Sequence, residues 1–207
     1  TLGLGTGRAA TAFVRALGAR VKEGLKVRGV ATSVATAEVA QELSIPLLTL
    51  EEAGTLDVTF DGADEVDPHL DLIKGYGGAL VREKITASSS RRLVILVGPE
   101  KMVSHLGDRG KLPVEVIPFG VSLCTSQLRE LHCETVLRKS ADGSVYVTDN
   151  GNFILDCQIA PIEDAAALDQ AIQSIPGALG TGLFVGMADA VIIGREAGPE
   201  VLERTSR

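Results

Sequence analysis

The residue types needed for proton transfer on a small polar substrate lie close together in one stretch of the sequence, residues 59–84. Asp61 follows what we predict to be the end of a buried strand, and Asp64 comes shortly after it. In an open α/β sheet, the ligand crevice lies just beyond the carboxyl ends of the strands. Lys74 then precedes a glycine-rich turn, and Glu83 lies on a short predicted helix. We therefore expect an acid, a base and a cation to converge at this corner of the fold.

The same carboxylates also allow plainer interpretations. Asp61 and Asp64, with Glu65 and Asp67 nearby, are typical of turns and caps when glycine and proline adjoin them. They could instead form a metal site, but their spacing lacks the alternating ligands of a calcium loop. Glu83 lies between two charged residues, so the residues alone favour a solvated charge on a helix.

The composition is that of an ordinary globular protein. The chain has 207 residues, 45% of them hydrophobic, and a formal net charge of -7. That charge argues against a nucleic-acid surface, which needs basic residues to neutralise phosphates. Nothing predicts a membrane span or a signal peptide. The three widely spaced cysteines are typical of a reducing compartment, so we expect a cytoplasmic protein. Because the chain opens inside a predicted strand without a starting methionine, we expect some N-terminal sequence to be missing.

Alternating strands and helices in the first half predict a doubly wound parallel sheet. The turn Gly5-Thr6-Gly7 joins the first strand to the N-terminus of the first helix, a position that favours phosphate binding. Ala10 stands where the dinucleotide fingerprint needs its last glycine, so a nicotinamide cofactor is disfavoured. The expected strands are residues 1–4, 27–31, 45–48, 56–60 and 92–97, and the expected helices are residues 8–22, 35–43 and 79–88.

The pattern changes after residue 112 and predicts a small α+β subdomain. The dipeptide Asp142-Gly143 between two apolar runs is a strong hairpin signal. A last apolar run, 190–193, predicts a strand that rejoins the first sheet. Within the subdomain, we expect strands at 114–117, 136–139, 145–148 and 153–157 and helices at 121–131 and 161–175.

Six motifs, standing in one order, resemble type A ribose-5-phosphate isomerases. They are GLGTG at 3–7, DGADEVD at 61–67, KGYGGALVREK at 74–84, PVEVIPF at 113–119, TDNGN at 148–152 and GLFVGMAD at 182–189. The resemblance covers nearly the whole chain, and six motifs in order are far more specific than any one of them.

This resemblance implies a fold and an activity. The fold is α/β, with a Rossmann-like parallel sheet carrying helices on both faces and a smaller α+β, ferredoxin-like subdomain. The expected domains are residues 1–112 with 183–207, and residues 113–182. The implied activity is a cofactor-free and metal-free aldose–ketose isomerisation between D-ribose 5-phosphate and D-ribulose 5-phosphate, in the non-oxidative branch of the pentose phosphate pathway. The implied partners are a small sugar phosphate and a second copy of the chain, usually in a dimer.

The resemblance also implies roles for individual residues. Glu83 is the implied general base, and Asp61 or Asp64 would move hydroxyl protons while the other holds the sugar. Lys74 and Lys101 are candidates to stabilise the oxyanion. The implied substrate-binding residues are Thr6, Gly7, Arg8, Ala9, Asp61, Gly62, Ala63, Asp64, Lys74, Gly75, Tyr76, Gly77 and Lys101.

Two positions depart from the pattern of the family. Arg8-Ala9 stands where the family usually has Ser-Thr, so two hydroxyl donors are replaced by a guanidinium. Tyr76 interrupts the glycine run that follows the lysine. Both changes could alter substrate contacts, and neither affects the proposed proton-transfer residues.

The sequence leaves two other functions possible. Sugar-phosphate sensor domains of bacterial repressors resemble this fold and bind without turnover, but a sensor needs no positioned base such as Glu83. Related amino-sugar-phosphate deaminases are a third class, but no histidine sits directly beside the candidate carboxylates Asp61, Asp64 and Glu83 to support their chemistry. Formation of a ketopentose from ribose 5-phosphate would separate the three.

Overall fold

The computed structural model describes residues 1–205 and divides the chain into two compact units. Unit 1 contains Thr1–Ala63, Arg82–Lys101 and the C-terminal residues from Met187 onward. Unit 2 contains Asp64–Val81 and Met102–Gly186. The domain limits expected from the sequence stay a prediction.

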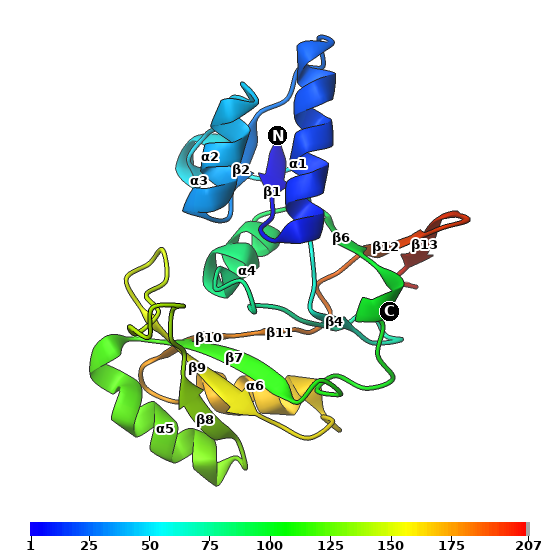
Figure 1. Cartoon of the computed structure of the whole chain (residues 1–207). Coiled ribbons are helices and arrows are strands. Elements are labelled where there is room, and N and C mark those ends of the chain that lie inside the picture. Colours follow the sequence, from blue (N-terminus) through cyan, green and yellow to red (C-terminus); the bar gives the residue numbers. More distant parts are fainter. Residues whose placement is uncertain (206–207) are drawn as a thin grey trace. The chain divides into compact units, whose positions relative to one another are not determined.

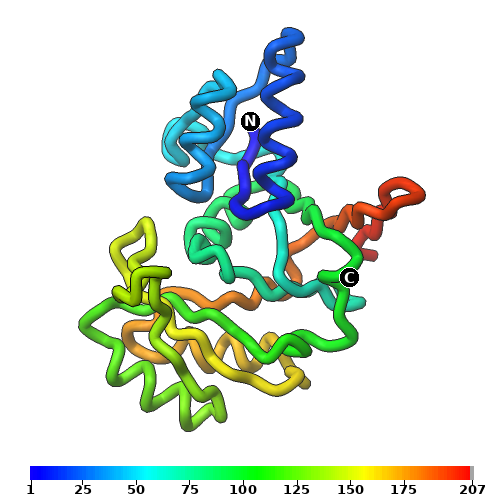
Figure 2. The backbone as a smooth tube through the Cα atoms, viewed as in Figure 1, coloured from blue at the N-terminus to red at the C-terminus, as the bar shows by residue number. Residues whose placement is uncertain are grey.

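Unit 1 is built on a six-stranded sheet in which five strands run parallel. The strand order is β13-β12-β6-β3-β1-β2, and only β13 is antiparallel to its neighbour. Figures 1 and 2 show β12 and β13 as the orange-to-red end of the chain beside the green β6. Because the parallel strands end at the same edge, residues that follow them gather there. The strands are β1 (Leu2–Leu4), β2 (Gly29–Ala31), β3 (Val58–Asp61), β6 (Leu93–Val97), β12 (Ala190–Arg195) and β13 (Gly198–Glu203).

Helices cover both faces of this sheet, as strand alternation shows. Phe60 of β3 stacks on Phe13 of α1, with ring centroids 4.3 Å apart. The neighbouring Thr59 points to the opposite face, where its hydroxyl lies 2.6 Å from that of Ser90, just after α4. The helices are α1 (Arg8–Lys22), α2 (Val34–Glu42), α3 (Leu50–Ala53) and α4 (Leu80–Ser88), whose first two residues belong to unit 2.

Some expected elements of unit 1 are wrong. The strand expected at 45–48 is a single bridge between Leu47 and Gly29, because Pro46 interrupts the run. The short helix α3 was not expected, although Thr49 and Glu52 form a capping box at its start. Strand β13 was also missed; it pairs with β12 through a tight hairpin at Gly198.

Unit 2 contains a four-stranded antiparallel sheet with two helices, in the order β7-α5-β8-β9-α6-β10. The spatial order β10-β7-β9-β8 is the split βαβ arrangement of ferredoxin-like folds. The expected fold class is thereby confirmed. The elements are β7 (Lys111–Val116), the 3-10 turn η2 (Pro118–Gly120), α5 (Val121–Glu130), β8 (Glu134–Leu137), β9 (Phe153–Gln158), α6 (Ala165–Gln173) and β10 (Ala178–Thr181).

Two expectations in unit 2 need correction. The strand at 145–148 is absent: only Val145 bridges to Lys139, and β8 pairs with β9 instead. The helix expected at 161–175 begins only after Asp164, whose side chain accepts the peptide N–H of Ala167 as an N-cap.

A second, three-stranded antiparallel sheet in unit 2 was not expected. It joins β4 (Glu65–Val66), β5 (Leu72–Ile73) and β11 (Leu183–Phe184). Two-residue strands carry no periodic signal, so the sequence could not indicate them. β4 begins directly after Asp64, and β5 ends directly before Lys74.

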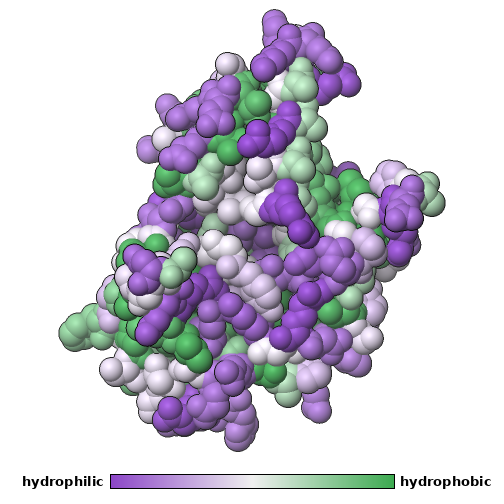
Figure 3. Space-filling model, viewed as in Figure 1, coloured by the Kyte–Doolittle hydropathy of each residue, from purple (hydrophilic) through white to green (hydrophobic). Residues whose placement is uncertain are grey.

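The surface of unit 2 carries an apolar patch around the start of α5 (Figure 3). Its most exposed member is Phe119 of η2, with 99% of its surface accessible. Ile117, Leu123 and Leu179 are exposed apolar neighbours in the sequence or across the β7–β10 pair. Over residues 1–205, no helix combines the length and the apolar character required to cross a membrane.

Candidate active site

In unit 1, Asp61 ties the end of β3 to the glycine turn before α1. Its Oδ1 accepts the peptide N–H of Thr6 at 3.1 Å and that of Gly62 at 2.7 Å. The side chain is buried. A Cβ at Gly5 would overlap the Asp61 carboxylate, so this close approach requires glycine. Two motifs that are far apart in the sequence therefore form one corner.

A cluster of hydroxyls lies beside the same turn, and the sequence analysis missed it. Thr6 Oγ1 is 2.7 Å from Thr32 Oγ1 and donates to Ser33 Oγ at 2.8 Å. Thr36 donates from its hydroxyl to the carbonyl oxygen of Gly5 at 2.9 Å. The available signal was the position of Thr32 and Ser33 directly after β2, at the same sheet edge as Asp61.

The remaining substrate-binding candidates of unit 1 lie at the start of α1 and after β6. Gly7 is the N-cap residue of α1 and provides no side-chain cap, while Arg8 and Ala9 begin the helix. Arg8 is 90% exposed, and its Nη2 lies 3.5 Å from Glu100 Oε1. Lys101 ends the 3-10 turn η1 (Pro99–Lys101) that follows β6. The structure thus brings Arg8 close to Glu100, which directly precedes Lys101 in the chain.

Glu83 is buried, with 4% of its surface accessible. The solvated helix charge favoured by the residues alone is therefore wrong. Glu83 shares the buried face of α4 with Leu80 and Ala87, at the i, i+3, i+7 spacing of one helix face. The spacing could be read from the sequence, but the charged neighbours of Glu83, Arg82 and Lys84, favoured an exposed position instead. Burying a carboxylate is costly, so its retention there calls for a specific use or partner.

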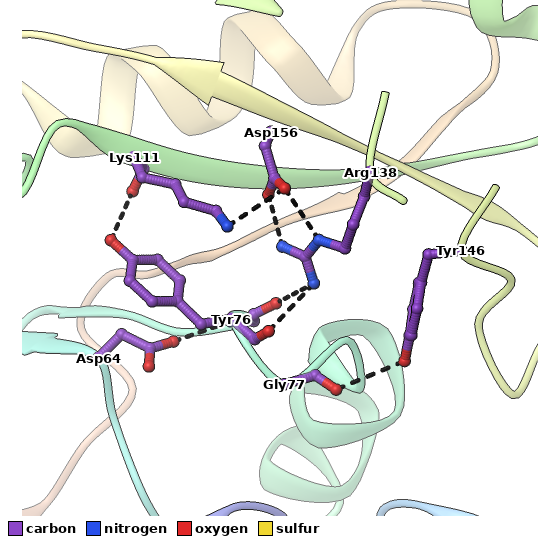
Figure 4. A network of polar contacts seen from close by, with 8 residues as sticks. Asp64, Tyr76, Gly77, Lys111, Arg138, Tyr146 and Asp156 are labelled. Carbon is purple, nitrogen blue, oxygen red and sulfur yellow. Dashed lines mark hydrogen bonds and ion pairs between the residues drawn. The ribbon is translucent and has the colours of Figure 1, made fainter. Parts of the chain in front are cut away.

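In unit 2, Asp64, Lys74 and the glycine turn are brought together. Asp64 Oδ2 accepts the peptide N–H of Tyr76 at 2.9 Å (Figure 4). Lys74 is 2% exposed, and its Nζ lies 5.6 Å from the centroid of the Phe184 ring. The peptide N–H of Lys74 donates to the carbonyl oxygen of Gly182 at 2.8 Å. A nearly buried ammonium thus adjoins a turn whose first peptide groups are held in place.

The side chain of Tyr76 points to β7. Its hydroxyl donates to the carbonyl oxygen of Lys111 at 3.3 Å, and the Lys111 ammonium lies 4.9 Å from its ring centroid. Burial raises the pKa of this phenol, which keeps it a neutral donor.

The other two carboxylates of the acidic run serve the loops. Glu65 accepts the peptide N–H groups of Gly107 and Arg109 at 2.6 and 3.0 Å, and burial raises its pKa. Asp67 accepts from His69 and Asp71 in a tight turn. The turn interpretation is confirmed for Asp67, whereas Glu65 lies in β4 and accepts from a loop that is distant in the sequence. Within the described chain, no group of three or more His, Cys, Asp or Glu side chains could hold a metal ion.

Comparisons with known proteins identify the family. The sequence profile of ribose 5-phosphate isomerase A (phosphoriboisomerase A) matches residues 28–198. Ribose-5-phosphate isomerase A of Roseiflexus castenholzii is 50% identical over 201 residues, which cover 96% of this chain and 85% of that protein. The chain belongs to the ribose-5-phosphate isomerase A family. The family is one of isomerases, so the expected family and enzyme class are confirmed, and a sensor domain is not favoured.

Solved structures agree with this membership of the isomerase family. A structure of ribose 5-phosphate isomerase A from Methanocaldococcus jannaschii has a TM-score of 0.93 and 40% identity, covering 98% of this chain and 90% of that one. A D-ribose-5-phosphate isomerase in complex with phospho-erythronic acid has a TM-score of 0.95 and 37% identity, with coverage of 98% and 90%.

Proposed function

We propose that this protein interconverts D-ribose 5-phosphate and D-ribulose 5-phosphate in the cytoplasm, within the non-oxidative branch of the pentose phosphate pathway. Family membership supports the reaction class. The observation that carries the proposal for this chain is the burial of Glu83 on a helix that directly follows the Lys74–Gly78 turn. A buried carboxylate is poorly solvated and therefore well suited to accept a proton from carbon.

The reaction moves one proton from C2 to C1 and another from the C2 hydroxyl to O1, and it leaves no net oxidation. Glu83 takes the proton from C2 of the open-chain aldose; the C–H electrons form a C1–C2 double bond, and the carbonyl electrons move to O1. A proton moves from the C2 hydroxyl to O1 with the help of Asp61 or Asp64. Glu83 then returns its proton to C1, and C2 becomes the ketone. Lys74 and Lys101 are the cations proposed to stabilise the enediolate oxygens.

The phosphate is proposed to bind at the start of α1. The peptide N–H groups of a first helical turn have no partner within the helix and favour an anion. The absence of acidic residues from the first turn of α1 supports this assignment. The proposed sugar-binding residues are Asp61, Gly62, Ala63, Asp64 and the Lys74–Gly77 turn.

The experiment is incubation of the protein with ribose 5-phosphate in deuterated water. Formation of a ketopentose with deuterium at C1 is expected, because a carboxylate base exchanges part of its proton with solvent. Phospho-erythronic acid, whose carboxylate resembles a planar enediolate, should inhibit competitively. Binding of ribose 5-phosphate without ketopentose formation would instead support the sensor alternative and refute the proposal.

The protein is also proposed to form a homodimer through the apolar patch of unit 2. Full exposure of Phe119, with three apolar neighbours, supports this, since patches of this kind commonly mark protein interfaces. Sedimentation should give about twice the chain mass of 21.6 kDa, and Phe119→Ser should weaken association. A mass near 21.6 kDa at micromolar concentration would contradict a dimer.

A further inference from the structure

One guanidinium in unit 2 joins the ferredoxin-like sheet to the glycine turn after Lys74. Arg138, just beyond β8, has a side chain that is 10% exposed. Its Nε and Nη2 donate to the two oxygens of Asp156 at 2.9 and 2.5 Å. Its Nη1 donates to two successive carbonyl oxygens, those of Gly75 at 3.0 Å and Tyr76 at 3.2 Å (Figure 4). The fork of the guanidinium is thus shared between a carboxylate and the turn.

The anchor of Arg138 is itself rigid. Asp156 lies within β9, a strand paired on both sides by β7 and β8. Lys111 of β7 adds a second cation, with its Nζ 3.2 Å from Asp156 Oδ2. Because Lys111 also packs on the Tyr76 ring, the side chain and the backbone of Tyr76 are held by the same network.

The contacts fix the orientation of two peptide groups. The peptide between Gly75 and Tyr76 is held at both ends, with its oxygen bound to Arg138 and its N–H bound to Asp64 at 2.9 Å. In the next peptide, the carbonyl of Tyr76 points to Arg138. This peptide is trans, so its N–H, which belongs to Gly77, points away from Arg138. Gly77 is exposed, so a ligand can approach this part of the turn.

The charge of Arg138 also acts through the first peptide. A hydrogen bond from a guanidinium to the Gly75 carbonyl polarises the peptide and strengthens donation by its N–H to Asp64. Arg138, which lies outside all six sequence motifs, is thus linked to Asp64 through the peptide between Gly75 and Tyr76.

We propose that Arg138 is a positioning residue for the isomerisation: anchored by Asp156, it orients the 75–77 turn so that Asp64 and the Gly77 N–H meet the sugar phosphate. This inference rests on the proposed function, because it takes the turn and Asp64 to contact substrate. Arg138 itself does not touch the reacting atoms.

The test compares Arg138→Ala, Arg138→Lys and a matched control, Arg129→Ala. Arg129 is an exposed arginine of the same unit that pairs with Glu134 at 3.5 Å. For Arg138→Ala, kcat/KM for ribose 5-phosphate should fall about 10- to 100-fold, with KM raised, because a small misplacement of binding groups is costly. Arg138→Lys keeps the charge but loses the fork, so its kcat/KM should be intermediate. Arg129→Ala should match the wild type.

KM separates positioning from folding, since a loss of folded enzyme lowers the apparent kcat and leaves KM unchanged. Folded Arg138→Ala with wild-type KM and kcat/KM would overturn the inference while leaving the proposed function intact. If Arg138→Ala does not fold, a wild-type KM in Arg138→Lys would overturn it equally. A wild-type protein without isomerase activity would overturn the proposed function, and this inference with it.

Discussion

The carboxylate of Asp61, at the end of β3, accepts the peptide N–H of Thr6 at 3.1 Å and so binds the first glycine turn to the central strand of the sheet. Asp61→Ala would leave the partly buried N–H groups of Thr6 and Gly62 without this acceptor. We expect the free energy of unfolding to fall by about 2 kcal/mol, the scale of a lost hydrogen bond to a charged group. Asp61→Asn, which keeps an oxygen acceptor, should lose less. Equal denaturation midpoints for Asp61→Ala and the wild type would contradict this role.

Glu83→Gln should abolish proton acceptance while preserving shape. We expect turnover to fall by roughly 100- to 10,000-fold, the usual contribution of a positioned acid–base group, with little change in affinity for phospho-erythronic acid. Steady-state kinetics and calorimetric binding measure the two effects. Glu38→Gln, at an exposed glutamate on α2, is the control and should behave as wild type. Near-normal turnover of Glu83→Gln would assign the base to another residue.

Arg8→Ala tests whether the guanidinium that replaces the usual hydroxyls of the family contacts phosphate. If it does, binding of ribose 5-phosphate should weaken by about 1.5–3 kcal/mol, and the penalty should shrink for unphosphorylated ribose. Arg15→Ala, an exposed arginine further along α1, provides the control. An equal effect on both sugars, or none, would leave Arg8 as a surface charge beside Glu100.

Exhaustive chelation should leave full activity, because lysine ammonium groups and hydrogen bonds can stabilise an enediolate without a divalent ion. The assay is ketopentose formation after dialysis against EDTA, compared with dialysis against buffer alone. Loss of activity that a divalent ion restores would instead identify the Asp61–Asp67 run as a metal site.

Glu65 should make the stability of unit 2 depend on pH. Burial raises its pKa above the ordinary value of 4.5, so the folded state retains this proton to higher pH than the unfolded chain does. Its contribution to stability is full below about pH 4.5 and is lost as pH rises through the folded pKa. Relative to Glu65→Gln, the wild type should therefore lose unfolding free energy as the pH rises above 4.5 and through the folded-state pKa. Denaturant titrations measure this difference, and a constant difference across that range would refute it. Glu163→Gln, at an exposed position, controls for the loss of a carboxylate.

Local patterns in the sequence were sufficient for the five parallel strands of the main sheet and for its first helix. The apolar stripe and the preceding glycine turn define α1 as Arg8–Lys22, because amphipathic periodicity and helix termination are local properties. The position of Asp61 at the end of a strand was equally predictable, since the buried run before it ends there. Order and composition of the motifs were enough to indicate the family.

The small sheet of unit 2 and the burial of Glu83 depended instead on contacts between residues far apart in the sequence. β11 pairs with β5 across more than a hundred residues, and two-residue strands leave no pattern from which that register could be read. Likewise, Glu83 became a buried carboxylate only when the face of α4 that carries Leu80 and Ala87 was covered. The charged residues at positions 82–84 had instead favoured a solvent-exposed side chain for Glu83.

Arg138 is the clearest case of a role that only the tertiary structure assigns. In the sequence it is one of two adjacent cations, Arg138 and Lys139, within an expected strand, and such charged residues are usually found in solvent. Its partners lie 18 residues ahead, at Asp156, and more than sixty residues behind, at Gly75 and Tyr76. Hydrogen bonds between such distant groups depend on how β8 and β9 pack against the glycine turn, and no local propensity encodes that packing.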